Sequence, residues 1–437
     1  MLSAKKIMYK KLSLLGISFV LGISLLQAQT ENSPYSRYGL GDLVPSQNIL
    51  NRGMGGASAA YFDFQSVNFV NPASYSRLKV TTLDIGAELD SRTLRTIDPP
   101  KKYNSISPNI SYVQIGIPLS QKRNWGMNIG LRPITRISYN VQSLGRMEGI
   151  DSVRTIYEGS GGSYQVYTGT GFSVGKFSLG FNVSYLFGSK DFSSQRFFIA
   201  DSANTFYFPA NYSYQASYGG LMLNSGIQFR QRLSKNTVLQ LGAYGNLKRN
   251  LRASRDEKIE TIQFSQDGSI QRIDSVRDIL DVKGEVTYPT SYGLGFMIAH
   301  KDKYLFAADY SSQKWSEFRF FNETDRVQDS WKFNVGGQIL PNALNPKSYW
   351  GRVAYRVGFM YGKDYINVDK DLPTYAITFG AGLPMRRAQY TNQHSVINTS
   401  LEFGRRGNKE NVLSENFFRF SVGFTLSDIW FIKRQYQ

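Results

Sequence analysis

Seven charged side chains interrupt the alternating segments of this chain on the face that carries small and polar residues. They are Arg132, Asp309, Lys332, Arg352, Arg356, Glu402 and Arg419. An unpaired charge in a narrow interior is costly, so such a set favours a network of ion pairs that fastens another part of the chain. In the functional interpretation, Arg132, Arg352, Arg356 or Arg419 holds the carboxylate of a bound molecule, because a guanidinium group binds a carboxylate through two parallel hydrogen bonds.

Catalytic patterns are weak in comparison. A hydrolase of the triad type needs a histidine with a serine and an acid, and the two histidines, His300 and His394, have no obvious partners. The absence of cysteine removes thiolate metal sites, cysteine nucleophiles and disulfides together. We therefore predict a protein that is not an enzyme and uses no cofactor and no metal.

The elements that must position these charges are strands with a period of two. In Phe177–Gly188, apolar side chains at odd positions alternate with Ser178, Gly180, Asn182 and Ser184. About fourteen such segments follow one another from Val80 to the C-terminus. They begin near Val80, Ser107, Asn124, Ser163, Lys176, Ser213, Asn236, Gly284, Tyr304, Asp329, Tyr349, Thr374, Ser395 and Asn416.

The connections between these segments alternate in length. Short ones include Ser120–Asn124 and His300–Lys303, whereas the long polar ones are Arg92–Ser107, Ser138–Gly162, Ser189–Tyr212 and Asn250–Lys283. Tight turns on one rim and long loops on the other are typical of an outer-membrane β-barrel, and aromatic residues at strand ends suit its interfacial girdles. The fold predicted is an all-β transmembrane antiparallel barrel of about 14 strands.

The first residues resemble a secretory leader. Four lysines precede an apolar run from Leu12 to Leu26, and Leu26-Gln27-Ala28 ends in small residues, so cleavage is expected near Ala28. The apolar run is shorter than the roughly 20 residues that a spanning helix needs. Export predicts a Gram-negative outer-membrane location. The formal net charge of +18 then fits contacts with anionic membrane lipids and lipopolysaccharide, and scattered basic residues without a recognition motif argue against nucleic acid.

Residues 29–79 contain no alternating strand. They hold three prolines, several glycines and scattered apolar side chains such as Leu40, Ile49 and Met54. A barrel of this size leaves a lumen too wide for its own side chains to fill. We expect three parts: a leader over residues 1–28, a hatch inside the lumen over 29–79 and the barrel over 80–437.

Two motifs in the hatch resemble a known family. The small-residue run Arg52–Ala60 contains Gly53, Gly55 and Gly56, and the triplet Asn71-Pro72-Ala73 follows it. Together with the strand count, they are similar to the FadL/TodX family of long-chain fatty-acid and hydrophobic-compound transporters. Gly161-Gly162 and the segment Leu401–Gly407 resemble its Bacteroidetes branch.

That resemblance implies a plugged barrel of 14 strands that takes up hydrophobic small molecules such as long-chain fatty acids. It also implies that the ligand leaves sideways, through a gap at a kinked third strand. Pro133 lies in the third segment, and a proline is tolerated in a strand only at an edge, a bulge or a break. Pro133 is therefore the lateral-gate candidate, unless it merely lies near the extracellular end of the strand.

A second function stays open. Related barrels of the same branch serve as accessory subunits of the type 9 protein-secretion machinery, as cargo shuttles or translocon plugs, and the sequence does not separate the two. The expected partners are therefore membrane lipids, a hydrophobic ligand and, in the alternative, a secretion-machine subunit. The aromatic segment Phe192–Tyr212 could be a docking patch or a lid over the entrance.

Overall fold

The computed structural model describes residues 33–97, 100–146, 152–199, 208–265, 270–301, 303–342, 348–368, 370–385 and 394–428. The predicted leader, its cleavage point near Ala28 and the aromatic residues after 428 lie outside these ranges. None of the described helices is both long enough and apolar enough to cross a membrane.

Within the described ranges, sixteen long strands make up the wall: β2 (Thr81–Thr96), β3 (Lys102–Ser120), β4 (Trp125–Arg146), β5 (Ser152–Val174), β6 (Phe177–Ile199), β7 (Ala210–Arg232), β8 (Thr237–Asn246), β9 (Arg249–Phe264), β10 (Ile270–Tyr288), β11 (Ser291–His300), β12 (Tyr304–Gln313), β14 (Ser330–Ile339), β15 (Ala354–Lys363), β16 (Pro373–Pro384), β17 (His394–Arg406) and β18 (Leu413–Asp428). β9 continues β8 along the edge of β7, and β10 runs on into β11 in the same way. Counted as wall strands, they form a closed antiparallel barrel of 14 strands, which confirms the predicted fold class.

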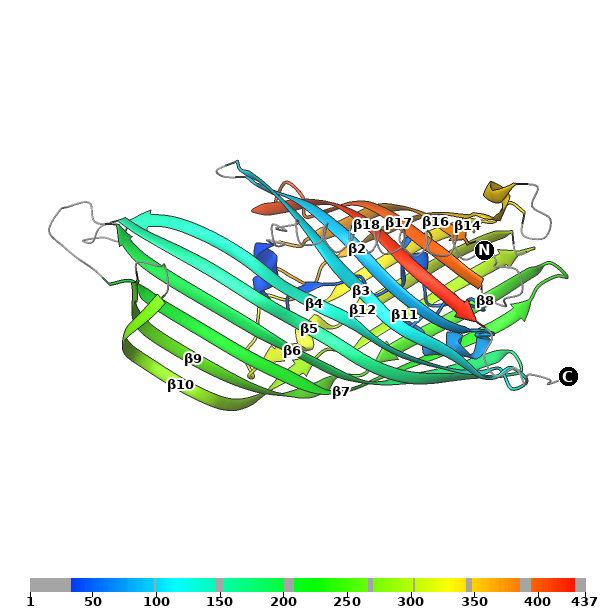
Figure 1. The fold of residues 1–437 in the computed structure, drawn as a ribbon, viewed down its shortest axis with the longest axis horizontal. Helices are drawn as coiled ribbons and strands as arrows, with labels where there is room; N and C mark the ends of the chain where they lie inside the picture. Colours follow the sequence, from blue (N-terminus) through cyan, green and yellow to red (C-terminus); the bar gives the residue numbers. More distant parts are fainter. Residues whose placement is uncertain are drawn as a thin grey trace, which may run out of the picture.

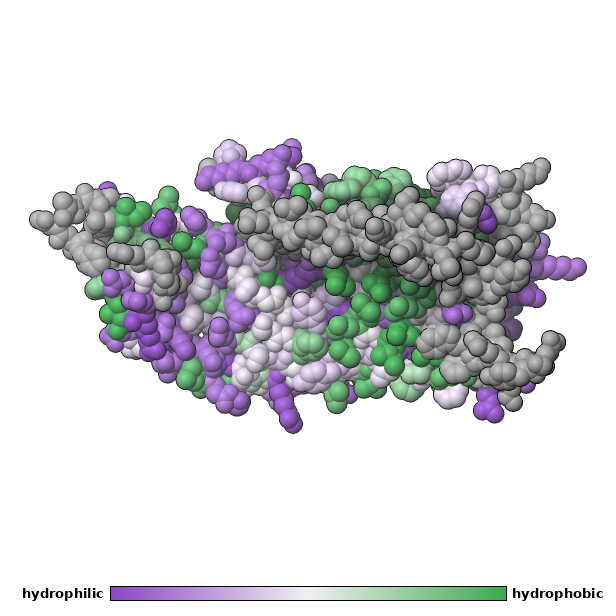
Figure 2. Space-filling view, in the orientation of Figure 1, coloured by the Kyte–Doolittle hydropathy of each residue, from purple (hydrophilic) through white to green (hydrophobic). Residues whose placement is uncertain are grey.

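The barrel buries polar residues and exposes apolar ones. Along β6, Phe181, Val183, Tyr185 and Phe187 are exposed, whereas Ser178, Asn182 and Ser184 are buried. Figure 2 shows apolar residues gathered over the part of the wall where the short strands lie, and a hydrophilic surface where the long strands project. This distribution is the one that a lipid-facing wall with a polar interior requires.

All four predicted long loops are wrong. Most of Arg92–Ser107 lies in β2 and β3, and much of Ser138–Gly162, Ser189–Tyr212 and Asn250–Lys283 continues the strands β4 to β7, β9 and β10 well beyond the apolar band (Figure 1). The outward positions of these extensions are mostly polar, as at Asn140, Arg154 and Glu158, so the extensions lack the apolar outer face that marks a lipid-facing strand. Ladder hydrogen bonds and cross-strand ion pairs hold them instead, such as Arg272–Glu260 at 3.4 Å.

The N-terminal region is built from short elements inside the ring. They are the 3₁₀ helix η1 (Pro34–Arg37), the two-residue strand β1 (Asp42–Leu43), the α-helix α2 (Ile49–Arg52) and the 3₁₀ helix η2 (Pro72–Arg77). Leu40, Ile49, Met54 and Ala73 in this region are fully buried. We refer to residues 33–79 as the hatch.

The extracellular mouth is packed with apolar side chains. The hatch residues Tyr35 and Leu40 meet Trp315 of the 3₁₀ helix η3 (Trp315–Glu317) and Tyr365 of the β15–β16 connection. The rings of Trp315 and Tyr365 lie 4.2 Å apart, and the Tyr365 hydroxyl donates a hydrogen bond to the carbonyl of Gly41. The short strand β13 (Arg319–Phe320) completes this cluster, whereas the 3₁₀ helix η4 (Tyr349–Arg352) lies at the opposite rim.

Candidate functional site

The wall has an interruption between β3 and β4. Their ladder runs from Ser120–Trp125 to Val113–Leu131 and ends there. From that point β3 is paired along the wall with β2 alone, after a register shift between Gly86 and Ala87, and β4 continues with β5. In Figure 1 the two strands separate toward the end where the long strands project, and hatch segments are visible between them. We call this interruption the β3–β4 opening.

The opening lies at the level of the apolar band. On β3, the outward apolar residues Val113 and Ile115 of the paired part are followed by Ile110 and Ile106 in the unpaired part. Ile110 is 64% exposed and Ile106 47% exposed. An unpaired stretch of strand at this depth leaves backbone groups without ladder partners, which a lipid environment tolerates only where other protein groups or a cavity receive them.

A proline lies near the interruption on each side. Pro133 lies two residues after Leu131, the last residue of β4 that is paired with β3, and the register between β4 and β5 shifts between Pro133 and Thr135. Pro108 lies in the unpaired part of β3, opposite Leu89 of β2. Neither residue has the N–H that a ladder on its second side would need. Pro133 thus lies beside an irregularity and at the start of an open edge, and its role as an exit remains a prediction.

A cavity of about 230 Å³ lies behind the opening. Its near wall consists of Leu43, Val44 and Pro45 of the hatch with Pro133 and Ile134 of β4. Polar and charged groups line the remainder, including Arg132 and Lys332. The cavity is therefore amphipathic, with apolar groups next to the membrane side.

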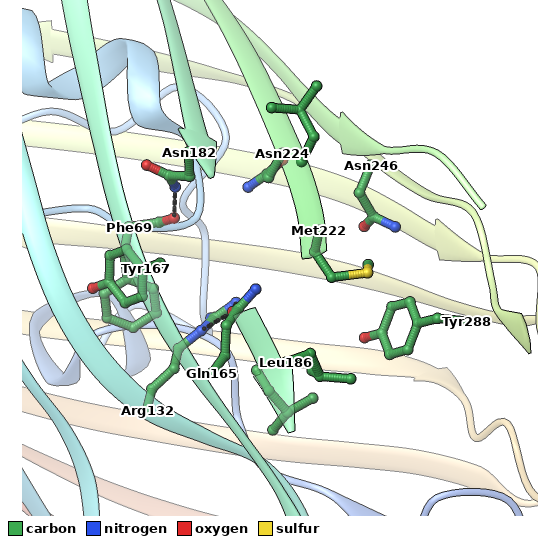
Figure 3. A pocket seen from close by; sticks show the side chains of 12 residues that line it. Phe69, Arg132, Gln165, Tyr167, Asn182, Leu186, Met222, Asn224, Asn246 and Tyr288 are labelled. Carbon is green, nitrogen blue, oxygen red and sulfur yellow. Dashed lines mark hydrogen bonds between the residues drawn. The ribbon is translucent and has the colours of Figure 1, made fainter. Parts of the chain in front are cut away.

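Among the arginines that line this cavity, Arg132 is the one that lacks an acidic partner among the described residues. Its guanidinium group donates to the Gln165 side chain at 2.9 and 3.0 Å and to the carbonyl of Ser46 at 3.1 Å, and it lies 4.9 Å from the centre of the Phe69 ring. No carboxylate of the described residues lies within ion-pair distance. A second, smaller cavity of about 60 Å³ borders the same group (Figure 3). A guanidinium group in this setting can accept an anion.

The arginine Arg419 has a different environment. It contacts Glu402 at 2.9 Å and Asp90 at 3.0 Å, and Glu88 lies 3.9 Å away. Arg419 belongs to a network that also contains Arg92, Arg406 and the hatch residue Asp42. Burial raises the pKa of the Asp42 carboxyl, but Arg406 and Arg92 outweigh it and hold that pKa below its usual value. Arg419 therefore fits the structural interpretation of the inward charges.

The remaining charged candidates, Arg356, Lys332 and Arg352, do not lie together. Arg356 is buried and donates to Gln338 at 2.7 Å and to Asn398 at 3.0 Å, beside Gly53 of the hatch and away from the cavity. Lys332 lines the cavity and has no hydrogen bond or ion pair to a described residue. The placement of Arg352 in the lumen was wrong, because it ends the helical turn η4 and is exposed. The strand begins only at Ala354, so the alternation does not extend back to Arg352.

The glycines of the hatch motif let two backbones touch. A Cβ at Gly55 would lie 2.7 Å from the carbonyls of Phe359 and Val335, and Gly55 and Gly56 have φ of +68° and +89°. Gly53 approaches Gly380 of β16 in the same manner. The sequence motif therefore corresponds to a seat on β14, β15 and β16, where the facing wall residues Gly336, Gly358 and Gly380 are also glycine.

The triplet Asn71-Pro72-Ala73 forms the second seat. The Asn71 side chain accepts a hydrogen bond from the Ala73 N–H at 3.1 Å and donates to the carbonyl of Ala59 at 2.6 Å. Pro72 starts η2, and its carbonyl lies against Gly171 and Gly180, where a Cβ would come within 2.4 Å. The triplet thus folds the hatch on itself and presses it onto β5 and β6.

Three residues near the opening were missed by sequence analysis: Asp42, Glu88 and Arg136. The Arg136 guanidinium group of β4 contacts the Glu88 carboxylate of β2 at 2.9 Å, and Arg52 of α2 binds the same carboxylate. Asp42 pairs with Arg136 through its backbone. In the sequence, Glu88 and Arg136 occupy strand positions that face the barrel interior, and this was the available signal. Their pairing across the opening depends on how the strands are arranged in the fold, so the sequence does not reveal it.

The two histidines were expected to have neither a catalytic nor a metal-binding role. His300 ends β11, and its Nδ1 atom lies 2.9 Å from the Thr237 hydroxyl. The side chain of His394 lies outside the described set. Within the described ranges, no group of three or more His, Asp or Glu side chains could hold a metal ion.

Several solved structures share the fold of this chain. The chain is similar to the CymD monoaromatic hydrocarbon channel, with 16% identity, a TM-score of 0.52 and coverage of 90% of this chain and 99% of the other. It is also similar to the Pseudomonas putida toluene transporter TodX, with 16% identity, a TM-score of 0.56 and coverage of 89% and 100%. A third similar structure is a Pseudomonas aeruginosa FadL homologue, with 13% identity, a TM-score of 0.52 and coverage of 89% of this chain and 98% of the other. These likenesses show that the chain shares the barrel fold of these FadL/TodX-type proteins. No curated protein matches the chain.

A family model supplies the assignment. The model described as BamG matches residues 8–437, which include the hatch, the β3–β4 opening and all the wall strands. The match does not bear on the Bacteroidetes branch expected from the sequence. The chain belongs to the BamG family.

Proposed function

We propose that this protein is an outer-membrane channel for hydrophobic small molecules, and that its ligand passes between the barrel and the membrane through the β3–β4 opening. One observation carries the proposal. The ladder between β3 and β4 ends within the apolar band, in front of an amphipathic cavity of about 230 Å³. A sideways passage spares an apolar molecule the cost of crossing a polar lumen.

The closed mouth supports the same route. The apolar cluster around Tyr35, Trp315 and Tyr365 fills the extracellular end between hatch and loops. A water-filled path straight through the barrel is therefore a poor fit to these residues, whereas the side wall is already interrupted. The likeness to hydrocarbon and toluene channels favours a channel over the type 9 secretion alternative.

The ligand class that fits the cavity is an amphiphile with an acidic head, such as a long-chain fatty acid. Val44, Pro45 and Ile134 offer an apolar surface for the chain. Arg132 offers a guanidinium group without an acidic partner for the head group. Arg352 is excluded from this role because it is exposed at the opposite rim.

The test is uptake of a labelled fatty acid by proteoliposomes that carry the Pro133→Ile variant. Isoleucine supplies the missing N–H and favours the strand, so the opening should narrow and uptake should fall severalfold, to roughly a third or less. Pro118→Ile is the matched control, because Pro118 lies in the part of β3 that is already paired with β4. Equal uptake by the Pro133→Ile variant and the wild type would count against the lateral route.

A further inference from the structure

The rims of the β3–β4 opening are connected from the inside by a short piece of the hatch. Residues 41–48 run between two fully buried anchors, Leu40 and Ile49. Within this piece, β1 pairs in antiparallel fashion with β4, through Asp42–Arg136 and Leu43–Thr135. The Val44 N–H donates to the Ile134 carbonyl at 3.0 Å. We call residues 41–48 the strap.

The strap covers the part of β4 that β3 leaves. The β3–β4 ladder ends at Leu131, and the strap takes up the ladder positions from Ile134 to Arg136. The strap therefore replaces β3 as the neighbour of β4 for a few residues. It lies inside the wall, and Leu43, Val44 and Pro45 face the cavity.

Two carboxylates join this edge to the opposite rim. Asp42 of the strap accepts hydrogen bonds from Arg92 of β2 and Arg406 of β17, both at 2.8 Å. Glu88 of β2 receives Arg136 of β4 at 2.9 Å together with Arg52 of α2. The Ser111 hydroxyl of β3 also donates to Glu88, at 3.1 Å. Each carboxylate thus connects the β4 side of the opening with the β2–β3 side.

The remainder of the hatch is held by other contacts. Gly53 and Gly55 sit on the wall glycines, and Asn71 and Pro72 sit on the opposite wall. The Asp309 carboxylate of β12 accepts the N–H groups of Ser58 and Ala59. None of these contacts involves the strap. The strap itself is tied to the hatch by Arg52, which donates to the carbonyls of Pro45 and Gln47, both at 3.0 Å, and by Asn48, which donates to the carbonyl of Val67 at 2.8 Å. Movement of the strap away from β4 must break these hydrogen bonds, but it leaves the docking of the hatch on both sides intact.

We propose that the strap is the gate of the β3–β4 opening and that Glu88 and Asp42 hold it shut. This inference rests on the proposed function for its role in passage, but the movement of the strap can be measured without any ligand. With the strap on β4, the cavity is separated from the membrane. Once the strap leaves β4, the edges of β3 and β4 face the cavity directly.

The first test measures strap movement by thiol labelling. The chain has no cysteine, so Leu43→Cys introduces its sole thiol. In proteoliposomes without ligand, this thiol should react with a small maleimide about tenfold faster when Glu88→Gln or Arg136→Gln is added, since either change removes an ion pair across the opening. Asp84→Asn is the control, because Asp84 is buried on the same face of β2 but bonds to the neutral Gln114 and Thr425.

The choice of variants distinguishes a folding defect of the barrel from a change in the movement of the strap. Arg136→Gln leaves the Arg52–Glu88 pair in place, and the Arg136 side chain is 18% exposed, so this variant disturbs the lumen less than Glu88→Gln. Arg136→Lys keeps a positive charge and should label at nearly the wild-type rate. Labelling of Leu43→Cys that does not change in either Gln variant would overturn the gate.

The second test fixes the strap. Leu43→Cys with Thr135→Cys places two thiols at register partners of β1 and β4, and Ala381→Cys with Thr399→Cys does the same in the continuous β16–β17 wall. Oxidation of the first pair should abolish fatty-acid uptake, and a reductant should restore it. The second pair should have no effect.

The two tests tell the two proposals apart. Faster labelling together with uptake that is unchanged both in the Pro133→Ile variant and in the oxidised strap pair would keep the moving strap and contradict the lateral channel. Uptake that falls in the Pro133→Ile variant but does not change when the strap disulfide forms would support the lateral channel and overturn the gate.

Discussion

Two interfaces between neighbouring wall strands, which we call seams, differ in how far their strands are paired. The β18–β2 seam, where the ring closes, is paired without a register shift from Leu413–Thr96 to Asp428–Thr81. The β3–β4 seam is paired from Ser120–Trp125 to Val113–Leu131, although β4 continues to Arg146. The two seams share strand type, apolar outer faces and polar inner faces. Pattern alone therefore does not decide which seam stays closed.

The difference lies in single residues. Neither β2 nor β18 contains a proline, whereas β3 has Pro108 and β4 has Pro133 beside the place where they part. Across the closed seam, Arg419 of β18 binds Asp90 of β2 directly. Across the open seam, the connections run through the hatch and through Arg136. The open seam thus differs from the closed one in the prolines near its end and in the charges that connect its two sides.

The largest expected effect is on the closed seam. Arg419→Gln leaves Glu402 and Asp90 buried without their partner, and it should lower the free energy of unfolding by about 3–5 kcal/mol. Urea unfolding in lipid vesicles measures this change, with the exposed Lys122→Gln as the control. A loss as small as that of the control would show that the seam does not depend on its charges.

The next effect concerns the ligand. Arg132→Gln should weaken binding of a fatty acid by about 1.5–3 kcal/mol, while binding of the matching alcohol changes less, because a hydrogen bond to a charged group is lost in one case alone. Arg356→Gln is the matched control, since Arg356 is buried with neutral partners outside the cavity. Equal weakening for acid and alcohol would remove Arg132 from head-group recognition.

A smaller effect should follow from making the open seam resemble the closed one. Pro108→Thr combined with Pro133→Ile restores both missing N–H groups, and fatty-acid uptake should fall about tenfold, further than with either change alone. Initial rates in proteoliposomes provide the comparison. If the double variant transports as fast as the wild type, the prolines do not set the width of the opening.

The smallest effect is expected far from both seams. Asn71→Ala removes a cap and a hydrogen bond within the hatch, and it should cost about 1 kcal/mol of stability while leaving the thiol reactivity at Leu43→Cys unchanged. Thermal unfolding followed by gel mobility detects the loss. A faster reaction at position 43 would mean that the hatch moves as one body and that the strap is not independent.

Much of the wall could be predicted because a lipid-facing strand shows its parity in the sequence. Phe177–Gly188 is an example, with every apolar side chain of the odd face exposed to the membrane side. The extensions escaped prediction because their outward positions are mostly polar, so no apolar outer face marks them in the sequence. β9 (Arg249–Phe264) carries seven charged residues among its sixteen. The ladder with its partner β10 has three register shifts, so the two-residue alternation of a regular strand is interrupted there.

The site was predicted in fragments. Pro133 and Arg132 were singled out from their strand, and the structure places both at the cavity. Arg352 was assigned to the lumen because strand parity was extended across a helical turn. Asp42, Glu88 and Arg136 were missed because their significance depends on a gap between strands, and a gap is a relation between β3 and β4 that neither strand reveals alone.

Photo-crosslinking by a fatty acid with a diazirine near its acidic head tests the lateral passage most directly. Proteoliposomes are illuminated during uptake, and the labelled residues are mapped by mass spectrometry. The account predicts labels on the facing edges of β3 and β4, around Ser111, Leu131 and Ile134, and on strap residues 43–46. Labels confined to the β18–β2 seam or to the extracellular mouth around Trp315 would contradict it.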